Sequence, residues 1–356
     1  MQKVIKQAVG IDCGKEELVV SIANLDAIFE EKNVITFGVS NDVSGFEKLC
    51  QMIKKQQHDG IEAHLVVEAT GVYHERLCYF LAENGLKISI ILPNRAASFM
   101  RTLSIKTIND KISSAALAIL GLQKKLDVWR VPEPTIYHLR QLSRERTSLL
   151  EDTTSMKNQI HALMHSAILA EGTLKRMQLR LEISQAQLAE IEQEMKLVIA
   201  GNKDLKQRFD NVCTIKGVGL ITAVTVVAET NAFNLIRNQR QLVSYAGLDV
   251  VKKESGTSIK TPGRISHKGN VHLRKALHFP ALAAVRYDDK MKDCYSNLLA
   301  KHNIKMKAAV AIQRKILVLI YTLWKNNEAY DVSKSAGKYL EQSKKTALTE
   351  LDLVRS

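Results

Sequence analysis

Residues 7–23, QAVGIDCGKEELVVSIA, decide the fold of the first part of this chain. One apolar run ends at Asp12, a short polar turn follows, and a second apolar run begins at Leu18. Short apolar runs separated by a polar turn predict two neighbouring antiparallel strands. A carboxylate at the end of a buried strand lies at the rim of its sheet. The stretch therefore predicts a sheet that carries Asp12 at its rim.

Glu68 repeats this arrangement at the end of the apolar run in HLVVEATGVYHERL, residues 64–77. If the two strands are neighbours, each carboxylate raises the pKa of the other unless a cation lies between them. Asp110, directly before an apolar helix, adds a third carboxylate. Such a set predicts a divalent-metal site of the kind that supports phosphodiester chemistry. The simpler interpretation of any one of these acids is a turn or helix-cap residue.

The first 130 residues alternate strand and helix patterns. Strands are expected at about 7–12, 17–24, 30–37, 64–70 and 87–93, and helices at about 42–57, 74–85 and 111–126. Three strands followed by alternating helices and strands predict an α/β layer with a mixed sheet. This is the element order of the ribonuclease-H-like (RuvC-like) fold.

Pro132 and Pro134 mark a boundary, after which the pattern becomes helical. Apolar residues repeat in steps of three and four over 139–167 and again over 174–198. Two such stripes predict either an antiparallel helical hairpin that forms a coiled-coil arm or two ordinary bundle helices, and the pattern does not separate these. The expected domains are 1–130, an arm at 135–200, a mostly helical domain at 205–325 and a polar tail at 326–356.

The composition favours a polyanionic partner. The net charge is +14, from 51 Lys and Arg against 37 Asp and Glu, which points to nucleic acid. The five cysteines form no CxxC pair, which argues against a zinc cluster or a disulfide framework and favours a reduced, cytoplasmic setting. No secretion signal opens the sequence, and the longest late apolar run, at 316–324, is too short to cross a membrane.

Residues 215–230, IKGVGLITAVTVVAET, resemble the hairpin of a helix-hairpin-helix motif. Backbone amides in such a turn can face a phosphate at the start of the following helix. Lys216, Gly217 and Gly219 are therefore candidate nucleic-acid contacts. A tight turn of any other kind can have the same sequence, so the signal is weak by itself.

Residues 252–277, KKESGTSIKTPGRISHKGNVHLRKAL, form the most basic stretch and contain a single acid, Glu254. Glycines and small residues between its cations let the backbone approach a phosphate. Ser255 lies in this loop, and a serine hydroxyl can attack phosphorus where cations neutralise the developing charge. The residues alone favour an incidental serine in a solvated loop, with Ser258 and Ser266 as equal rivals. The candidate phosphate contacts are Lys260, Arg264, Lys268, Arg274 and Lys275.

Several motifs, in order, resemble the Piv-like transposases of the IS110 insertion-sequence family. They are GIDCGKEELVVSIA, VVEATGVYHERL, KTINDKISSAALA, IKGVGLITAVTVVAE and SYAGLDV followed by ESGTSIKTPGRISHKGNVHLRKAL, and they span roughly residues 5–325. The resemblance implies a RuvC-like domain with a DEDD carboxylate set, a coiled-coil arm and a transposase domain with a serine nucleophile. It also implies a recombinase guided by a structured bridge RNA that pairs with donor and target DNA.

Carried over by position, Asp12, Glu68 and Asp110 match the first three carboxylates, which implies Mg²⁺ as cofactor. Ser255 matches the serine that attacks DNA. The fourth carboxylate is missing, because Ser113 stands where an Asp is expected, and a neutral serine is a weaker ligand. Asn109 is a nearby oxygen donor that would compensate in part. The family further implies a homodimer that assembles to a tetramer on DNA, in a bacterial or archaeal cytoplasm near the nucleoid.

Two other functions fit the same residues. One is a RuvC-type, metal-dependent junction nuclease that uses water as nucleophile, with Ser255 only contacting phosphate. The other is a non-catalytic protein that binds RNA and DNA through a defective metal site, which Ser113 favours.

Overall fold

The computed structural model describes residues 3–69, 71–103, 105, 107, 109–234, 236–251, 254–255, 259–260, 264–266 and 268–331. The chain forms two compact units, Met1–Val131 and Pro132–Ser356. The division falls at the proline-marked boundary. The predicted tail lies almost wholly outside the described residues.

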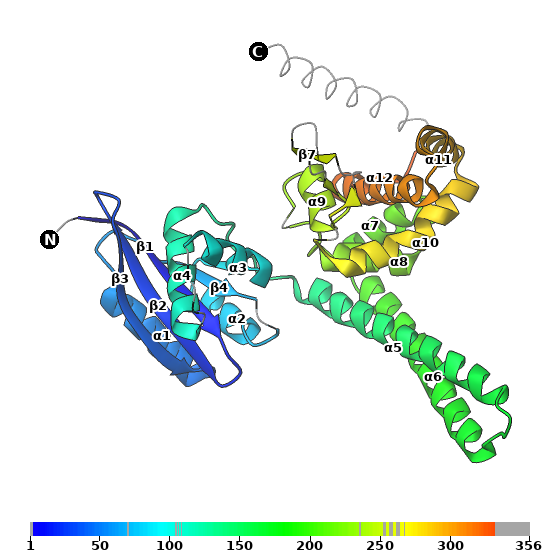
Figure 1. Ribbon diagram of the computed structural model, residues 1–356, viewed down its shortest axis with the longest axis horizontal. Coiled ribbons are helices and arrows are strands. Elements are labelled where there is room, and N and C mark those ends of the chain that lie inside the picture. Colours follow the sequence, from blue (N-terminus) through cyan, green and yellow to red (C-terminus); the bar gives the residue numbers. More distant parts are fainter. Residues whose placement is uncertain are drawn as a thin grey trace, which may run out of the picture. The chain divides into compact units, whose positions relative to one another are not determined.

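The first unit is built on a five-stranded mixed sheet (Figure 1). Its strands are β1 (Val4–Cys13), β2 (Glu17–Asp26), β3 (Glu31–Ser40), β4 (His64–Glu68) and β5 (Ile88–Ile91), in the order β3-β2-β1-β4-β5. β1, β2 and β3 pair antiparallel, whereas β4 runs parallel to both β1 and β5. The predicted α/β class with a ribonuclease-H-like strand order is confirmed.

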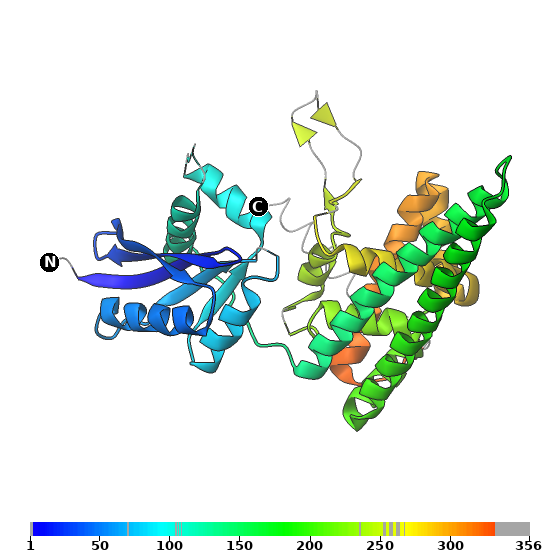
Figure 2. The same cartoon turned by 90° about the horizontal axis from the view of Figure 1, so that it is seen from below.

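Helices cover both faces of this sheet. They are α1 (Val43–Gln56), α2 (Glu75–Glu83), α3 (Pro93–Thr102) and α4 (Asp110–Gln123). Alternate residues of β1 face opposite sides, so Val9 and Ile11 pack in one core with α1 and α2, while Ala8 packs with α4. Figure 2 shows α1 on one side of the sheet and α4 on the other. Residues 10 and 12 of β1 therefore lie on the α4 side.

The second unit begins with an antiparallel hairpin of two long helices, α5 (Pro134–Met164) and α6 (Glu171–Ala200) (Figure 2). The base of the hairpin is buried in the core of this unit, where Leu139 and Met195 are fully enclosed. The tip is open, and Ile168 between the helices is 87% exposed. Both predicted alternatives hold in part, since the base is bundled and the tip projects as an arm.

Six further helices complete this core. They are α7 (Lys203–Cys213), α8 (Leu220–Glu229), α9 (Gln239–Tyr245), α10 (Val271–Tyr287), α11 (Asp289–His302) and α12 (Lys305–Asn326). The apolar face of α12, with Ile312, Ile316 and Ile320, packs against α7, α10 and α11. No helix in the described part of the chain is long and apolar enough to span a membrane.

Between α9 and α10 the chain forms a narrow β-hairpin, seen at the end of the second unit in Figure 2. β6 (Val250–Val251) pairs with β9 (Arg264–Ile265), and farther out β7 (Glu254–Ser255) pairs with β8 (Ile259–Lys260). Within the predicted basic stretch 252–277, these short strand pairs place Ser255 in the outer pair, and residues 271–277 form the start of α10.

Candidate functional site

The two strand-end carboxylates lie level with each other. β1 and β4 are parallel neighbours in which Ile11 pairs with Val67, so Asp12 and Glu68 are the next residues of each strand. Residues at the same level of neighbouring parallel strands point to the same face. Both carboxylates therefore lie on the α4 side, at the carboxyl ends of their strands.

Close packing fixes α4 over this rim. A Cβ on Gly10 would lie 2.0 Å from the carbonyl oxygen of Ser114 and 2.3 Å from the amide nitrogen of Ala118, so the α4 backbone rests directly on β1. The Ser114 hydroxyl lies 2.8 Å from that of Ser21 on β2. At the start of α4, the Asn109 side chain caps the helix by accepting from the Ile112 amide at 2.9 Å. That oxygen is therefore used within the protein.

Residues at the start of α4 change the pKa of Asp12. Burial raises the pKa of Asp12, the negative charge of Asp110 raises it further, and a hydrogen bond from the Ser113 hydroxyl opposes the rise. Ser113 is 7% exposed, so this bond is shielded from water. Burial likewise raises the pKa of the Cys13 thiol, with added contributions from Asp12 and Glu68. The acids of β1, β4 and α4 thus gather near one end of the sheet.

The oxygen atoms of these side chains are of the type that binds a hard cation. Carboxylate oxygens are the ligands that Mg²⁺ prefers, and a cation would relieve the unfavourable charge that raises the pKa of Asp12. Among the described residues, however, no three His, Cys, Asp or Glu side chains are arranged to hold one metal ion. Asp110 is exposed at the helix start. The site is an open rim of acids.

Asn41 also shapes this rim and was not singled out from the sequence. Its Nδ2 donates to the carbonyl oxygens of Gly14 at 2.8 Å and Tyr73 at 3.0 Å. These carbonyls belong to the loops that follow β1 and β4, so one side chain ties the two loops beyond Asp12 and Glu68 together. An exposed Asn after a strand gives no sequence signal for such a role, because turns commonly contain it.

In the second unit, Ser255 lies in β7 and its backbone pairs with Ile259 of β8. Ser266, a rival nucleophile, belongs to the root of the hairpin: its hydroxyl donates to Asp249 Oδ1 at 2.5 Å and its amide to the Asp249 carbonyl at 2.9 Å. Ser258, the other rival, is outside the described residues. Lys260 lies opposite Glu254 in the register.

The predicted phosphate contacts differ in their surroundings. Arg264 and Lys268 are exposed near the root of the hairpin. Arg274 donates through Nη1 to the Ala246 carbonyl at 2.9 Å, and Lys275 contacts Glu151 Oε1 at 2.5 Å on α5. The last two cations therefore already bind groups of the protein, and their sequence gave no sign of this because both partners are distant in the chain.

The turn between α7 and α8 joins two helices, in keeping with a helix-hairpin-helix-like segment. Gly217 has φ +88°, and a Cβ there would lie 2.7 Å from the Pro280 carbonyl oxygen, so packing on α10 requires this glycine. Gly219 caps α8 with open space around it, and Lys216 is exposed. Gly219 has open space at the start of α8, where a phosphate could approach, whereas Gly217 is exposed but closely packed against α10 on the side of its missing Cβ.

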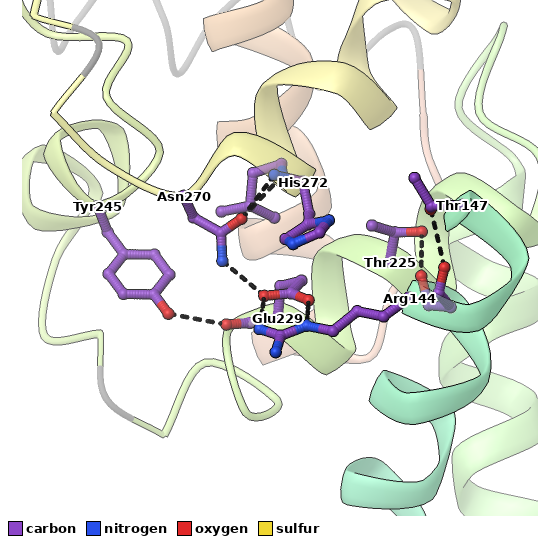
Figure 3. Close-up of polar contacts among 9 residues, drawn as sticks. Arg144, Thr147, Thr225, Glu229, Tyr245, Asn270 and His272 are labelled. Atoms are coloured by element: carbon purple, nitrogen blue, oxygen red, sulfur yellow. Dashed lines mark hydrogen bonds and ion pairs between the residues drawn. The ribbon is translucent and has the colours of Figure 1, made fainter. Parts of the chain in front are cut away.

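A buried acid that the sequence interpretation passed over lies at the end of α8. The side chain of Glu229 is 1% exposed and accepts two hydrogen bonds from Arg144 of α5, Nε to Oε1 at 2.6 Å and Nη2 to Oε2 at 3.0 Å. Asn270 Nδ2 donates to Oε2 at 2.6 Å (Figure 3). Its partners lie 85 and 41 residues away along the chain, so no local pattern could reveal the cluster.

Two family models match separate parts of the sequence. A model described as "Transposase", of the DEDD type found in IS110 elements, matches residues 9–168. A second, described as "Transposase IS116/IS110/IS902 family", matches residues 210–296. The first includes the acidic rim, and the second includes both Glu229 and the β-hairpin.

Similar proteins cover much of the chain. The "Pilin gene-inverting protein" of Moraxella bovis is 25% identical over 332 residues, which are 92% of this chain and 98% of that protein. The "Transposase for insertion sequence element IS1111A" of Coxiella burnetii is 31% identical over 147 residues, or 40% of this chain and 39% of that one. Among solved structures, T. thermophilus RuvC with a Holliday junction substrate is 9% identical, with a TM-score of 0.27 over 35% of this chain and 99% of that one. The chain belongs to the IS110 family of transposases, and it is an enzyme that recombines DNA.

Proposed function

We propose that this transposase cuts and rejoins DNA through a covalent ester at Ser255, assisted by a Mg²⁺ site at Asp12, Glu68 and Asp110, with a structured RNA as guide. The observation that carries the proposal is the level position of Asp12 and Glu68 on neighbouring parallel strands. The electrostatic effect of Asp110 on Asp12 supports it. Ser255 in a projecting, cation-rich hairpin supplies the nucleophile.

The chemistry is a transesterification. The Ser255 hydroxyl oxygen forms a bond to a backbone phosphorus, the bond from that phosphorus to the 3′ oxygen breaks, and the serine proton ends on the released 3′ oxygen. After strand exchange, a 3′ hydroxyl of the other strand attacks the ester and frees Ser255. Because the ester conserves the energy of the broken bond, rejoining needs no nucleotide cofactor.

The acidic rim, formed by Asp12, Glu68 and Asp110, would hold and orient the scissile strand only once a cation neutralises it. Asp12, Glu68 and Asp110 are the residues that would bind Mg²⁺, which supplies positive charge to the phosphate. Without a cation, the negative charge of the acidic rim repels a phosphate. The rim therefore prevents DNA from binding there in the absence of the metal. The Ser113 hydroxyl donates a hydrogen bond to Asp12, which favours the ionised carboxylate that a cation would bind.

Donor DNA, target DNA and guide RNA are the expected partners, close to the chromosome of a bacterial or archaeal cell. The exposed cations Arg264 and Lys268, with Lys216 and Gly219 at the start of α8, contact phosphates. A homodimer that assembles to a tetramer on DNA brings the carboxylates of one protomer to the serine of another.

A second candidate function is nucleic-acid binding without catalysis. Two observations favour it: Ser113 replaces a carboxylate, and no three-ligand metal cluster is formed among the described residues. A junction nuclease that uses water is the third candidate, and it requires the rim without Ser255.

One experiment separates the three. The purified protein is incubated with its RNA, labelled DNA and Mg²⁺, and the products are run on denaturing gels. The proposal expects a protein–DNA adduct that Ser255→Ala abolishes, while Ser266→Ala, which changes a serine at the root of the same hairpin, retains it. Cleaved ends that survive Ser255→Ala would establish hydrolysis by water. DNA that is retarded on native gels but intact on denaturing gels would show that the protein binds DNA without cutting it.

A further inference from the structure

The buried carboxylate of Glu229 is surrounded by donors that favour its ionised form. Burial alone raises the pKa of Glu229, but the hydrogen bonds from Arg144 and Asn270, and the charge of Arg144, hold it below its usual range. A buried charge is tolerated only where its partners are well placed, and removal of one partner is strongly destabilising. The three side chains therefore act as one unit (Figure 3).

This unit lies where the serine hairpin enters and leaves the helical core. Asn270 caps α10 directly after the hairpin, and its amide donates to the Tyr245 carbonyl at 2.8 Å, directly before the hairpin. The Tyr245 hydroxyl in turn donates to the Glu229 carbonyl at 3.0 Å. A Cβ on Gly269 would lie 2.4 Å from the Gly247 amide nitrogen, so the two roots touch. Glu229 thus binds both roots of the hairpin, one through its side chain and one through its backbone.

The same unit reaches the arm. Arg144 belongs to α5, and the neighbouring Ser143 hydroxyl lies 2.8 Å from that of Thr225 on α8. Seven residues farther along α5, Glu151 contacts Lys275 of α10. The arm is consequently fastened by polar side chains to the helix that carries Glu229 and to the helix that begins at the hairpin root.

We propose that Glu229 is a positioning residue that couples the arm to the Ser255 hairpin, by holding Arg144 of the arm and Asn270 of the hairpin root on one carboxylate. This inference rests on the nucleophilic role proposed for Ser255. The carboxylate fixes the direction in which the hairpin leaves the core relative to α5.

Stability alone does not explain this choice of residues. Well-packed apolar side chains at such a position often stabilise a protein as well as a buried ion pair does, or better. An ion pair with a bidentate Arg is directional, since the planar guanidinium accepts only a narrow range of carboxylate orientations. The cluster therefore specifies an angle between elements, which is the property that a projecting nucleophile needs.

Two variants disrupt the unit formed by Arg144, Glu229 and Asn270, one at the acceptor and one at a donor. Glu229→Gln keeps the shape of the side chain and removes its charge. Asn270→Ser keeps a good cap for α10, because serine caps helices about as well as asparagine, and removes the donor to Glu229. The matched control is Arg146→Met, which lies two residues from Arg144 on α5 and breaks an ion pair of 2.7 Å with Glu192 inside the arm.

The first measurement is hydrogen exchange of the free protein, followed at the amides of Leu248, Ser266 and Asn270. Leu248 donates to Val243 before the hairpin, whereas Ser266 and Asn270 at the second root donate to Asp249 and Tyr245 at the first. We expect exchange at least ten times faster in Glu229→Gln and Asn270→Ser, with unchanged exchange along α6 and α12. Arg146→Met should leave the root amides as they are in the wild type.

The second measurement is the rate of Ser255-dependent adduct formation on saturating DNA and RNA. We expect a tenfold or larger loss in both variants, with DNA retention within threefold of the wild type, and a change below twofold in Arg146→Met. A purely structural role would instead lower adduct and binding together, in proportion to the folded fraction.

Unchanged exchange at the root amides in Glu229→Gln would overturn the proposal, as would a normal adduct rate despite faster exchange. If Glu229→Gln does not fold, the proposal is tested with Asn270→Ser, by hydrogen exchange at the root amides and by the rate of adduct formation. If the wild type forms no adduct, the function proposed for Ser255 fails, and the exchange data still decide whether Glu229 holds the root of the hairpin.

Discussion

At Gly10 the backbone of α4 lies so close to β1 that a methyl group has no room. The atoms that a Cβ would meet, at 2.0 and 2.3 Å, belong to the helix backbone and cannot rotate away. Gly10→Ala must therefore push α4, and with it Asp110, away from the acidic rim. Overpacking of this kind costs about 1–3 kcal/mol, and we expect a loss at or above the upper end because both contacts are backbone atoms.

Thermal unfolding checks this prediction. The control is Gly172→Ala in helix α6, where the nearest atom to a Cβ is the mobile end of the Arg176 side chain at 3.5 Å. Alanine favours a helix over glycine by about 1 kcal/mol at most, so the control should be neutral or stabilising. Equal stability of Gly10→Ala and the wild type would mean that α4 does not rest on β1.

Glu229 predicts a pH dependence of stability. Its pKa is lowered in the folded protein despite burial, because Arg144 and Asn270 bind the ionised form. The stabilising contribution is therefore complete above the unfolded pKa of about 4.3 and is lost as the pH falls through the lower folded value. We expect the difference in melting temperature between wild type and Glu229→Gln to be constant from about pH 5 to 7 and to shrink below about pH 4. A difference that widens on acidification would contradict this assignment.

The sequence predicts the positions of Asp12 and Glu68 but not that of Glu229. Asp12 and Glu68 could be placed at one rim because each ends an apolar strand, and strand periodicity is a local property. Glu229 could not, because an acid at the end of an apolar helix has the same local pattern whether it is buried or solvated. Its partners on α5 and at the α10 cap are brought to it by tertiary packing alone.

At the scale of elements, the strands and long helices follow from periodicity, and the exceptions have physical reasons. The sequence predicts a strand that ends at Pro93, but Pro93 begins α3 in the structure, because proline suits the first turn of a helix. Thr153 and Ser184 interrupt the apolar stripes of the arm but are buried, since each hydroxyl donates to a backbone carbonyl one turn earlier. A hydroxyl group that donates to a carbonyl of its own helix can be buried at little cost, so these residues can occupy core positions.

The start of α4 supplies a prediction for the missing fourth carboxylate. Ser113 donates a hydrogen bond to Asp12, and Ser113→Asp replaces it with a second negative charge. Without Mg²⁺ the variant should unfold at a lower temperature than the wild type, because like charges repel. With Mg²⁺ its stabilisation should exceed that of the wild type, and a tenfold gain in affinity corresponds to about 1.4 kcal/mol.

The control for this comparison is Ser113→Asn, which has nearly the shape of aspartate without its charge. It should lose stability without gaining a larger response to Mg²⁺. If Ser113→Asp and Ser113→Asn respond equally to Mg²⁺ in thermal unfolding, the acids at the start of α4 and on the strand ends do not share a cation.

At the scale of the whole molecule, the net charge of +14 makes binding to nucleic acid strongly dependent on salt. A protein that contacts about 6–10 phosphates loses roughly 10³–10⁵ in affinity between about 50 and 200 mM salt, because bound counterions are released. The structure divides the predicted cations into two classes, and a salt titration separates them. Lys268 is exposed at the hairpin root, whereas Arg274 is held by the Ala246 carbonyl.

We therefore expect Lys268→Ala to lower the slope of log affinity against log salt by about 1 for duplex DNA, with unchanged melting temperature. Arg274→Ala should lower the melting temperature and leave the slope of the folded protein nearly unchanged, since its guanidinium fastens α10 to the end of α9. The measurement is DNA affinity across a salt series, next to thermal unfolding of each variant. A lower slope for Arg274→Ala at wild-type stability would show that this side chain leaves Ala246 to bind phosphate.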